Sequence, residues 1–300
     1  MRGDAPHVLQ MKVPSGVRVE KPVYLTNLMR GLEDCDTRIE LQVKIGKGGQ
    51  ACVVVTDRSV QDLPFSTVRE INADVDKDAS FSLFSFEELG RQSVSSNSIQ
   101  IFSRGRVNVG IFCLTGGISE NRISLELAED GAQADLFGIV IASGKQQVKN
   151  EVSVTHRASH CTDRELFKQI LDEEATGRFE GLVKVSSGVA GTDSRQISRN
   201  ICLSRTARAF AQPQLIIDSD DVKCSHGATV GMLDEEALFY MQQRGIRRHE
   251  ARLLLLSAFL AEVIDKVSVP SVRDNLHLMA EERLRGELDH CVSCSVCKTQ

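Results

Sequence analysis

The sequence has no tryptophan and only two tyrosines among its 300 residues. No stretch of it approaches the roughly 20 consecutive apolar residues that a membrane-spanning helix needs. The N-terminal segment MRGDAPHVLQ also lacks the apolar centre of a signal peptide. We therefore expect a soluble, cytoplasmic protein that has no membrane partner.

Long runs of one charge sign are missing as well. The 36 basic and 41 acidic residues are interspersed and leave a formal charge of -5, which gives a nucleic-acid groove no electrostatic support. The nine cysteines are an odd number, scattered through the first 224 residues and then clustered at the C-terminus. This distribution does not resemble the disulfide framework of a small secreted domain, so we expect reduced thiols.

The usual catalytic motifs are absent from the sequence. The segment GKGG at 46–49 lacks the spacing and the terminal Lys-Ser or Lys-Thr of a P-loop. There is no G-x-S-x-G, and the carboxylates are too dispersed to assign a glycosidase pair. Any ATP must therefore be bound by a partner, and we expect this chain not to be an enzyme.

Short apolar clusters with a period near two fill the region from about residue 13 to 231, and they predict strands of roughly four to seven residues. Turn-forming groups such as Gly116-Gly117, Asp130-Gly131 and Ser187-Gly188 separate them. From ISLEL, at 123–127, onward most strand centres are about a dozen to twenty residues apart. This spacing suits either a β-helix or a sandwich. The clusters are RIELQVKI, ACVVVT, ISLELAEDG, ADLFGIVIASG, EVSVTH, EGLVKVSSG and PQLIIDS.

The segment CTDRELFKQILDEEAT, at 161–176, interrupts this pattern. Thr162 or Asp163 can cap a short helix. Its apolar face would consist of Leu166, Phe167, Ile170 and Leu171. We therefore predict one helical excursion from the strand scaffold here.

From residue 233 the apolar period becomes helical. LDEEALFYMQQRGI offers Asp234 as N-cap and Gly245 as the stop of a first helix. Pro270 ends a second helix, and Gly286 weakens the end of a third. The predicted apolar stripe of the second helix is Ala251, Leu254, Leu255, Ala258, Phe259 and Ile264, and that of the third is Val272, Leu276, Met279, Leu284 and Leu288.

The segment DDVKCSHGATVGMLDEEALFYMQQRGI, at 220–246, resembles the signature of the SufB/SufD family, the scaffold components of the SUF machinery that assembles iron–sulfur clusters. The similarity extends upstream through 159–185, 193–204 and 212–218, and downstream through 250–265. Within the family the chain is more similar to SufD, because the SufB version carries a glutamate after the histidine, where this chain has Gly227.

The resemblance implies a mainly β fold, a right-handed parallel β-helix followed by a C-terminal helical domain. It implies that residues 1–231 form the β-helix core and that 232–290 dock an ABC-type ATPase, SufC. It also implies that the β-helix pairs with a SufB-like scaffold, and we keep a self-dimer as the alternative. No cofactor is expected to be bound stably, while iron or a cluster would be held transiently at a shared interface.

Cys224 and His226 are the candidate cluster-assembly or metal residues. In a strand, side chains at i and i+2 lie on the same face about 7 Å apart. Thiolate and imidazole both bind iron and zinc, but a closed site needs three or four ligands, so another chain must complete it. The alternative is a small buried cysteine beside a polar histidine. We interpret Gly227 and Gly231 as turn residues.

Three further groups of residues could contact a partner or bind a metal. Phe239 and Tyr240 lie in the segment that the family resemblance assigns to contact with SufC. Cys291, Cys294 and Cys297 follow His290 in a tail, 291–300, that we expect to be mobile and that could hold a metal transiently. His156 and His160 precede Cys161, but a turn explains them better than a metal site does.

A β-helical polysaccharide-active enzyme is the competing function, because that fold also hosts lyases and hydrolases. Such an enzyme usually carries a secretion signal and a groove rich in aromatic residues for stacking on sugars. A chain without tryptophan fits that class poorly.

Overall fold

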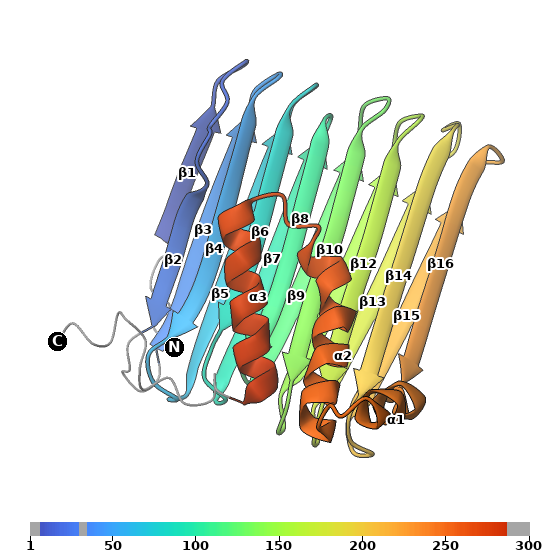
Figure 1. Ribbon diagram of the computed structural model, residues 1–300. Coiled ribbons are helices and arrows are strands. Elements are labelled where there is room, and N and C mark those ends of the chain that lie inside the picture. Colours follow the sequence, from blue (N-terminus) through green and yellow to red (C-terminus); the bar gives the residue numbers. More distant parts are fainter. Residues whose placement is uncertain (1–6, 30–34, 287–300) are drawn as a thin grey trace.

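The computed structural model describes residues 7–29 and 35–286, which form a parallel β-solenoid with helices on one side (Figure 1). Sixteen strands and three helices lie within these residues. The strands are β1 (His7–Val13), β2 (Val23–Met29), β3 (Cys35–Ile45), β4 (Gln50–Ser59), β5 (Phe65–Val75), β6 (Ser80–Glu88), β7 (Ser93–Ser103), β8 (Arg106–Thr115), β9 (Ile118–Leu127), β10 (Gln133–Ala142), β11 (Gln147–His156), β12 (Thr162–Leu171), β13 (Thr176–Val185), β14 (Thr192–Cys202), β15 (Arg208–Ile217) and β16 (Val222–Gly231). The helices are α1 (Glu235–Gln243), α2 (Arg248–Ile264) and α3 (Pro270–Arg285).

Successive strands alternate between two eight-stranded sheets. The odd-numbered strands make sheet A, in the order β1 to β15, and the even-numbered strands make sheet B, in the order β2 to β16. Neighbouring strands within each sheet pair in parallel, so one strand from each sheet makes one turn of the solenoid. The parallel pairing confirms the β-helix and excludes the antiparallel sandwich.

The inward-facing residues of the two sheets form the core of the solenoid. The middle strands of sheet A alternate between buried and less buried residues, as β9 shows from Ile118 to Leu127. We predicted inward positions on three of these strands, and all of them are buried: Leu125, Leu127, Val152, Val154, Val183 and Val185. Each such side chain contributes about 1.5–3 kcal/mol through removal of apolar surface from water.

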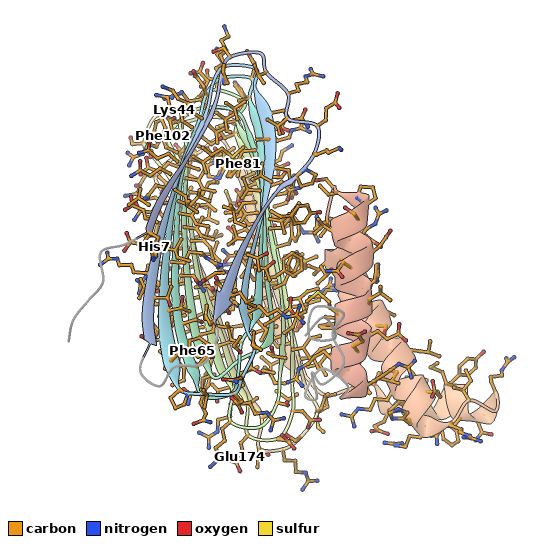
Figure 2. The ribbon with its side chains drawn as sticks, turned by 90° about the vertical axis from the view of Figure 1, so that its left-hand side faces the viewer. His7, Lys44, Phe65, Phe81, Phe102 and Glu174 are labelled. Carbon is orange, nitrogen blue, oxygen red and sulfur yellow. The ribbon has the colours of Figure 1, made fainter. Side chains whose placement is uncertain are left out.

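The middle strands of sheet B are buried on both faces, because α2 and α3 cover the outer face (Figures 1 and 2). This corrects the predicted helix near residue 162, which is strand β12. Phe167 and Leu171 point into the solenoid core, while Leu166 and Ile170 pack in the second core beneath the helices. A strand that is buried on both faces has no alternation of apolar and polar residues. The four apolar residues of β12 therefore had the spacing expected for one face of a helix.

α1 begins and α3 ends at the residues that the sequence indicated, whereas the buried face of α2 and the role of Pro270 differ from the prediction. The Asp234 side chain accepts hydrogen bonds from the backbone at the start of α1, and α3 ends at Gly286 in a left-handed conformation. The predicted stripe of α2 was wrong in part, since Leu254 is 52 % exposed and Ala258 is also exposed. The buried face of α2 is Ala251, Leu253, Leu256, Leu260, Val263 and Ile264. Pro270 does not end α2 but begins α3.

Charged side chains of α2 and α3 also form hydrogen bonds and an ion pair with residues at the ends of sheet B strands. Arg283 of α3 is buried, and its guanidinium donates to the Leu114 carbonyl and to Ser143 Oγ, both at 2.7 Å. Arg252 of α2 pairs with Asp172 at 3.0 Å. These contacts fix which end of each helix lies beside which turn of the solenoid.

Polar residues also lie in register inside the solenoid. Asn97, Asn121 and Asn150 occupy the same position on β7, β9 and β11, and their amides donate to one another at 2.9 and 3.1 Å. In the preceding turns, buried Arg69 of β5 pairs with buried Asp57 of β4. These contacts offset part of the cost of burying polar side chains, although Arg69 Nε and Asn97 Oδ1 have no hydrogen-bond partner.

Candidate functional site

Cys224 and His226 lie on β16, the last strand of sheet B. This agrees with the prediction that strands continue to about residue 231. Their register partners on β14 are Ser194 and Gln196, both buried, so Cys224 and His226 belong to the inward-facing row. Gly227 and Gly231 also lie within β16, which corrects their interpretation as turn residues. The same-face placement of the thiol and the imidazole follows from the strand period.

The solenoid ends at this pair of strands within residues 7–29 and 35–286. There, β16 pairs only with β14, and β15 pairs only with β13, so each keeps one free backbone edge. His226 is therefore exposed although it faces inward, and Cys224 is half-buried. Burial, together with the charge of Asp163, raises the pKa of the Cys224 thiol. The pair is accessible from the end of the solenoid.

Buried acidic residues lie two strands beneath this pair. Asp163 and Glu165 of β12 are in register with Ser194 and Gln196, and both are buried. The Asp163 Oδ1 atom lies 2.6 Å from Nε2 of buried His156, and Glu165 accepts from Gln196 Nε2 at 2.7 Å. Burial and the neighbouring Asp163 raise the pKa of Glu165 well above its ordinary value.

We did not predict this polar interior from the sequence. Asp163 was assigned to a helix cap and His156 to a turn, and both are inward-facing core residues of strands. The sequence contained one indication of this polar interior: Asp163 and Glu165 are two residues apart. In a strand, that spacing places both side chains on the same face.

Phe239 and Tyr240 lie on α1, which lies near the ends of the last strands in Figure 1 and projects away from the two sheets in Figure 2. They are 62 % and 60 % exposed, while their neighbour Leu238 is the buried residue of this helix. The guanidinium of Arg244 lies over the Tyr240 ring, 5.2 Å from its centroid. Exposed apolar side chains that lie together can form part of a protein interaction site.

No group of three or more His, Cys, Asp and Glu side chains in the described residues is arranged to hold a metal ion. Cys224 and His226 by themselves supply two ligands, so a metal held there would need further ligands from another molecule. Cys291, Cys294 and Cys297, the other metal candidates, lie outside the described residues.

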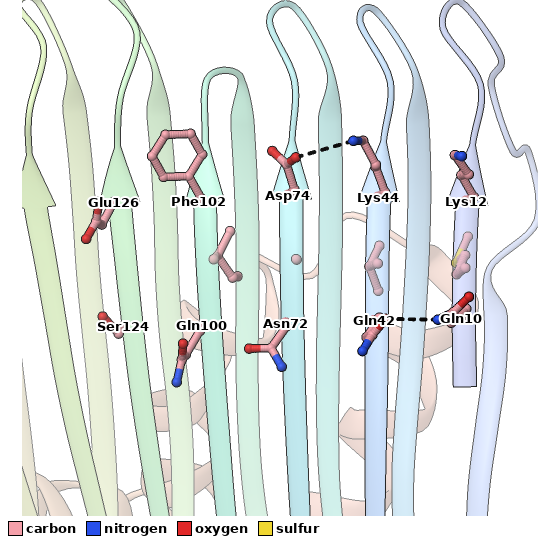
Figure 3. A pocket seen from close by; sticks show the side chains of 14 residues that line it. Gln10, Lys12, Gln42, Lys44, Asn72, Asp74, Gln100, Phe102, Ser124 and Glu126 are labelled. Carbon is pink, nitrogen blue, oxygen red and sulfur yellow. Dashed lines mark hydrogen bonds and ion pairs between the residues drawn. The ribbon is translucent and has the colours of Figure 1, made fainter. Parts of the chain in front are cut away.

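A groove of about 620 Å³ lies on the outer face of sheet A, remote from Cys224 and His226 (Figure 3). Side-chain amides line it, and Gln10 donates to Gln42 at 3.0 Å. Its carboxylates are ion-paired: Asp74 with Arg104 at 2.9 Å, and Glu126 with Arg157 at 2.6 Å. The hydrogen bond from Arg157 lowers the pKa of Glu126, which is the opposite of what a general acid requires.

The chain belongs to the SufBD family. Residues 37–259 match the family described as "SUF system FeS cluster assembly, SufBD core domain", which covers the solenoid from β3 onward together with α1 and most of α2. The family resemblance noted in the sequence is thereby confirmed.

Among its relatives, the SufD-like character is clear. The chain is 27 % identical to the iron–sulfur cluster assembly protein SufD of Escherichia coli over 94 % of its own length and 68 % of the relative. It is 27 % identical to SufD of Bacillus subtilis over 91 % of its own length and 63 % of that protein. A SufBD family protein of Synechocystis is 32 % identical over a match that covers 59 % of this chain and 36 % of that relative. The match therefore spans only about a third of the length of that protein.

No helix among the described residues is both long and apolar enough to cross a membrane.

Proposed function

We propose that this chain is a non-catalytic scaffold subunit of the SUF iron–sulfur cluster assembly complex. In this proposal it pairs with a SufB-like scaffold through the open end of its solenoid, and residues 232–290 dock a SufC-like ATPase. The observation that carries the proposal is that Cys224 and His226 occupy the inward row of a terminal turn whose strand edges are free.

The free edges of β15 and β16 favour a partner that is itself a β-sheet. Unpaired backbone N–H and C=O groups bind an added strand, and burying a bare edge in this way also prevents aggregation. A partner strand there would place its own side chains opposite Cys224 and His226. Iron or a nascent cluster would then be cargo held between two chains.

The exposed aromatic pair on α1 supports docking of the ATPase. Phe239 and Tyr240 supply large exposed apolar area on α1, the helix that lies near the last strands of the solenoid in Figure 1. Aromatic residues are enriched among those that contribute most to binding energy at protein interfaces. In this proposal ATP is hydrolysed by the partner, and this chain neither binds nor hydrolyses ATP.

The alternative of a polysaccharide-active enzyme finds no support in the groove on sheet A. A glycosidase needs one protonated carboxyl group and one free carboxylate, whereas Asp74 and Glu126 both pair with arginine. A binding assay with polysaccharides would test this alternative directly.

Reconstitution with SufB-like and SufC-like chains tests the proposal. The His226→Ala variant should lower the cluster yield, measured by absorbance and acid-labile sulfide after anaerobic incubation with iron, a sulfur donor and ATP. Its free energy of unfolding should stay within about 0.5 kcal/mol of the parent, because His226 is exposed. Thr229→Ala, an exposed change on the same strand, is the matched control.

Two outcomes would count against the proposal. A normal cluster yield from His226→Ala would remove His226 from the mechanism. Elution of the chain as a self-dimer, with no binding to the SufB-like protein, would replace the heterodimer by the self-paired alternative.

A further inference from the structure

One row of inward-facing side chains leads from the interior of the solenoid to the candidate ligand. Glu165 of β12, Gln196 of β14 and His226 of β16 are successive register partners. Neighbouring strands are about 4.8 Å apart, so each side chain in the row lies next to the following one. Gln196 is therefore the only member of this row that stands between the buried carboxyl group and the imidazole.

Gln196 is buried completely, and its carboxamide is held from one side. The Nε2 atom donates to Glu165 Oε2 at 2.7 Å, whereas the Oε1 atom has no hydrogen-bond partner. A buried carbonyl oxygen without a partner is costly, and in native proteins such an atom calls for an explanation. Gln196 therefore offers an unused acceptor at the register position next to His226.

A glycine on the opposite sheet makes room for this carboxamide. A Cβ atom added to Gly181 of β13 would come within 2.4 Å of Gln196 Nε2 and 2.6 Å of its Oε1. The next residue of that row in sheet A is Pro213, which has no backbone N–H to donate. The amide nitrogen donates toward β12, and β16 with His226 is the neighbour of β14 on the other side, where the oxygen can accept a hydrogen bond.

We propose that Gln196 is a positioning residue for His226: its side-chain oxygen accepts the N–H of one imidazole nitrogen and leaves the other nitrogen free for a ligand at the open end. A second hydrogen bond of this kind fixes the tautomer and ring orientation of metal-binding histidines. His226 is exposed, so no packing opposes the required rotation of its ring. The part of the proposal that concerns the ligand rests on the proposed function, but the hydrogen bond does not.

The tautomer of His226 in the isolated, metal-free chain tests the hydrogen bond. The chain is prepared with ¹⁵N-labelled histidine, and its ring nitrogens are recorded by NMR at about pH 8, where an ordinary imidazole is neutral. The chain has seven histidines, so a His226→Gln sample assigns the signal. We expect one dominant tautomer in the parent and the mixture of a solvent-exposed imidazole in Gln196→Met.

Two glycine variants give a matched comparison. Gly181→Ala should displace the Gln196 carboxamide and release the tautomer as Gln196→Met does. Gly177→Ala is the control, because its new Cβ would instead meet Gln169 Oε1 at 2.1 Å, and Gln169 belongs to a row that ends at Val230. The control should change stability without changing the His226 signal.

A tautomer mixture in the parent chain would overturn the proposal, and that measurement needs no variant to fold. An unchanged His226 signal in a folded Gln196→Met or Gly181→Ala protein would overturn it as well. Since metal and partner chains are absent from this experiment, its failure is distinct from a failure of His226→Ala to affect cluster assembly.

Discussion

Lys168 of β12 and Glu262 of α2 form an ion pair across the second core, with Nζ and Oε2 2.6 Å apart. The Lys168 side chain is 3 % exposed, and its ammonium group also donates to the Phe259 carbonyl at 2.6 Å. The same group lies over the Phe259 ring, 4.6 Å from the centroid. One cation therefore meets two acceptors and an aromatic face of α2, and it holds that helix against the sheet.

Replacing Lys168 by Met should destabilise the protein by about 1.5–3 kcal/mol, because a charged hydrogen bond is lost while most of the volume is kept. Urea unfolding measures the change, and hydrogen exchange should show lower protection of α2. Lys266→Met is the control, since Lys266 lies 4.0 Å from Asp135 in a more exposed pair. Equal effects of the two substitutions would contradict the anchoring role of Lys168.

The buried pair of Asp57 and Arg69 should be more sensitive still. Asp57→Asn leaves the Arg69 guanidinium inside the solenoid without its counter-charge, which typically costs about 3–5 kcal/mol. Glu70→Gln breaks the exposed pair with Arg38 on the same sheet and should cost less than about 1 kcal/mol. Chemical denaturation of both variants compares them, and similar losses would show that Arg69 is solvated in some other way.

Glu165 predicts a pH dependence of stability. Burial raises its pKa in the folded state above the ordinary value of 4.5, so the folded protein binds the proton more tightly than the unfolded chain does. The contribution of Glu165 to the free energy of unfolding is fully present below about pH 4.5, where the carboxyl group is protonated in both states. As the pH rises toward the pKa of the folded state, this contribution falls by about 1.4 kcal/mol per pH unit. The Glu165→Gln variant should therefore gain stability relative to the parent as the pH rises.

Urea titrations at a series of pH values measure that difference. Glu120→Gln, on the exposed face of β9, is the control and should follow the parent at every pH. A constant gap between Glu165→Gln and the parent would mean that Glu165 ionises normally.

The aromatic pair on α1 gives a binding prediction. Phe239→Ala combined with Tyr240→Ala should abolish co-purification with a SufC-like ATPase, because truncation of anchoring aromatic residues commonly costs about 2 kcal/mol or more each. The melting temperature should change little, since both side chains are exposed. Leu254→Ala, another exposed apolar position in the helical region, is the control. Undiminished binding by the double variant would place the docking surface elsewhere.

The cysteine tail is tested by truncation. Removing residues 290–300, with Cys291, Cys294 and Cys297, should reduce the iron or zinc measured by elemental analysis if the tail holds metal. Both proteins must be purified under reducing conditions, because exposed thiols oxidise. Equal metal content in the two samples would show that the tail is not a stable metal site.

The strand pattern was readable from the sequence in several strands that have one face toward solvent and an apolar inward row. β9, β11 and β13 alternate clearly, and Asp234 marks the start of α1 through local hydrogen bonds. β5 and β7 also alternate but were not among the predicted clusters, because their inward rows include polar residues such as Arg69 and Asn97. β12 was misread because its outer face lies beneath α2, which is about 90 residues later in the chain. A local pattern carries no information on such a contact.

Of the candidate site, the sequence predicted only the two residues of the terminal strand, Cys224 and His226. The spacing of Cys224 and His226 indicates that they share a face, which holds for any strand. That Gln196 and Glu165 lie behind His226 depends on the register of β12, β14 and β16, in which paired residues are about 30 positions apart along the chain. Register over such distances is a property of the fold and not of any segment.

The bare terminal turn also sets how the molecule moves. Each turn of a solenoid gains stability mainly from its immediate neighbours, so a turn with one neighbour opens more readily than a turn with two. Backbone amides of β15 and β16 should therefore exchange with solvent faster than those of β9 or β10. A scaffold that binds this end would supply the missing neighbour, and the ordering of these last two strands would then be part of the assembly reaction itself.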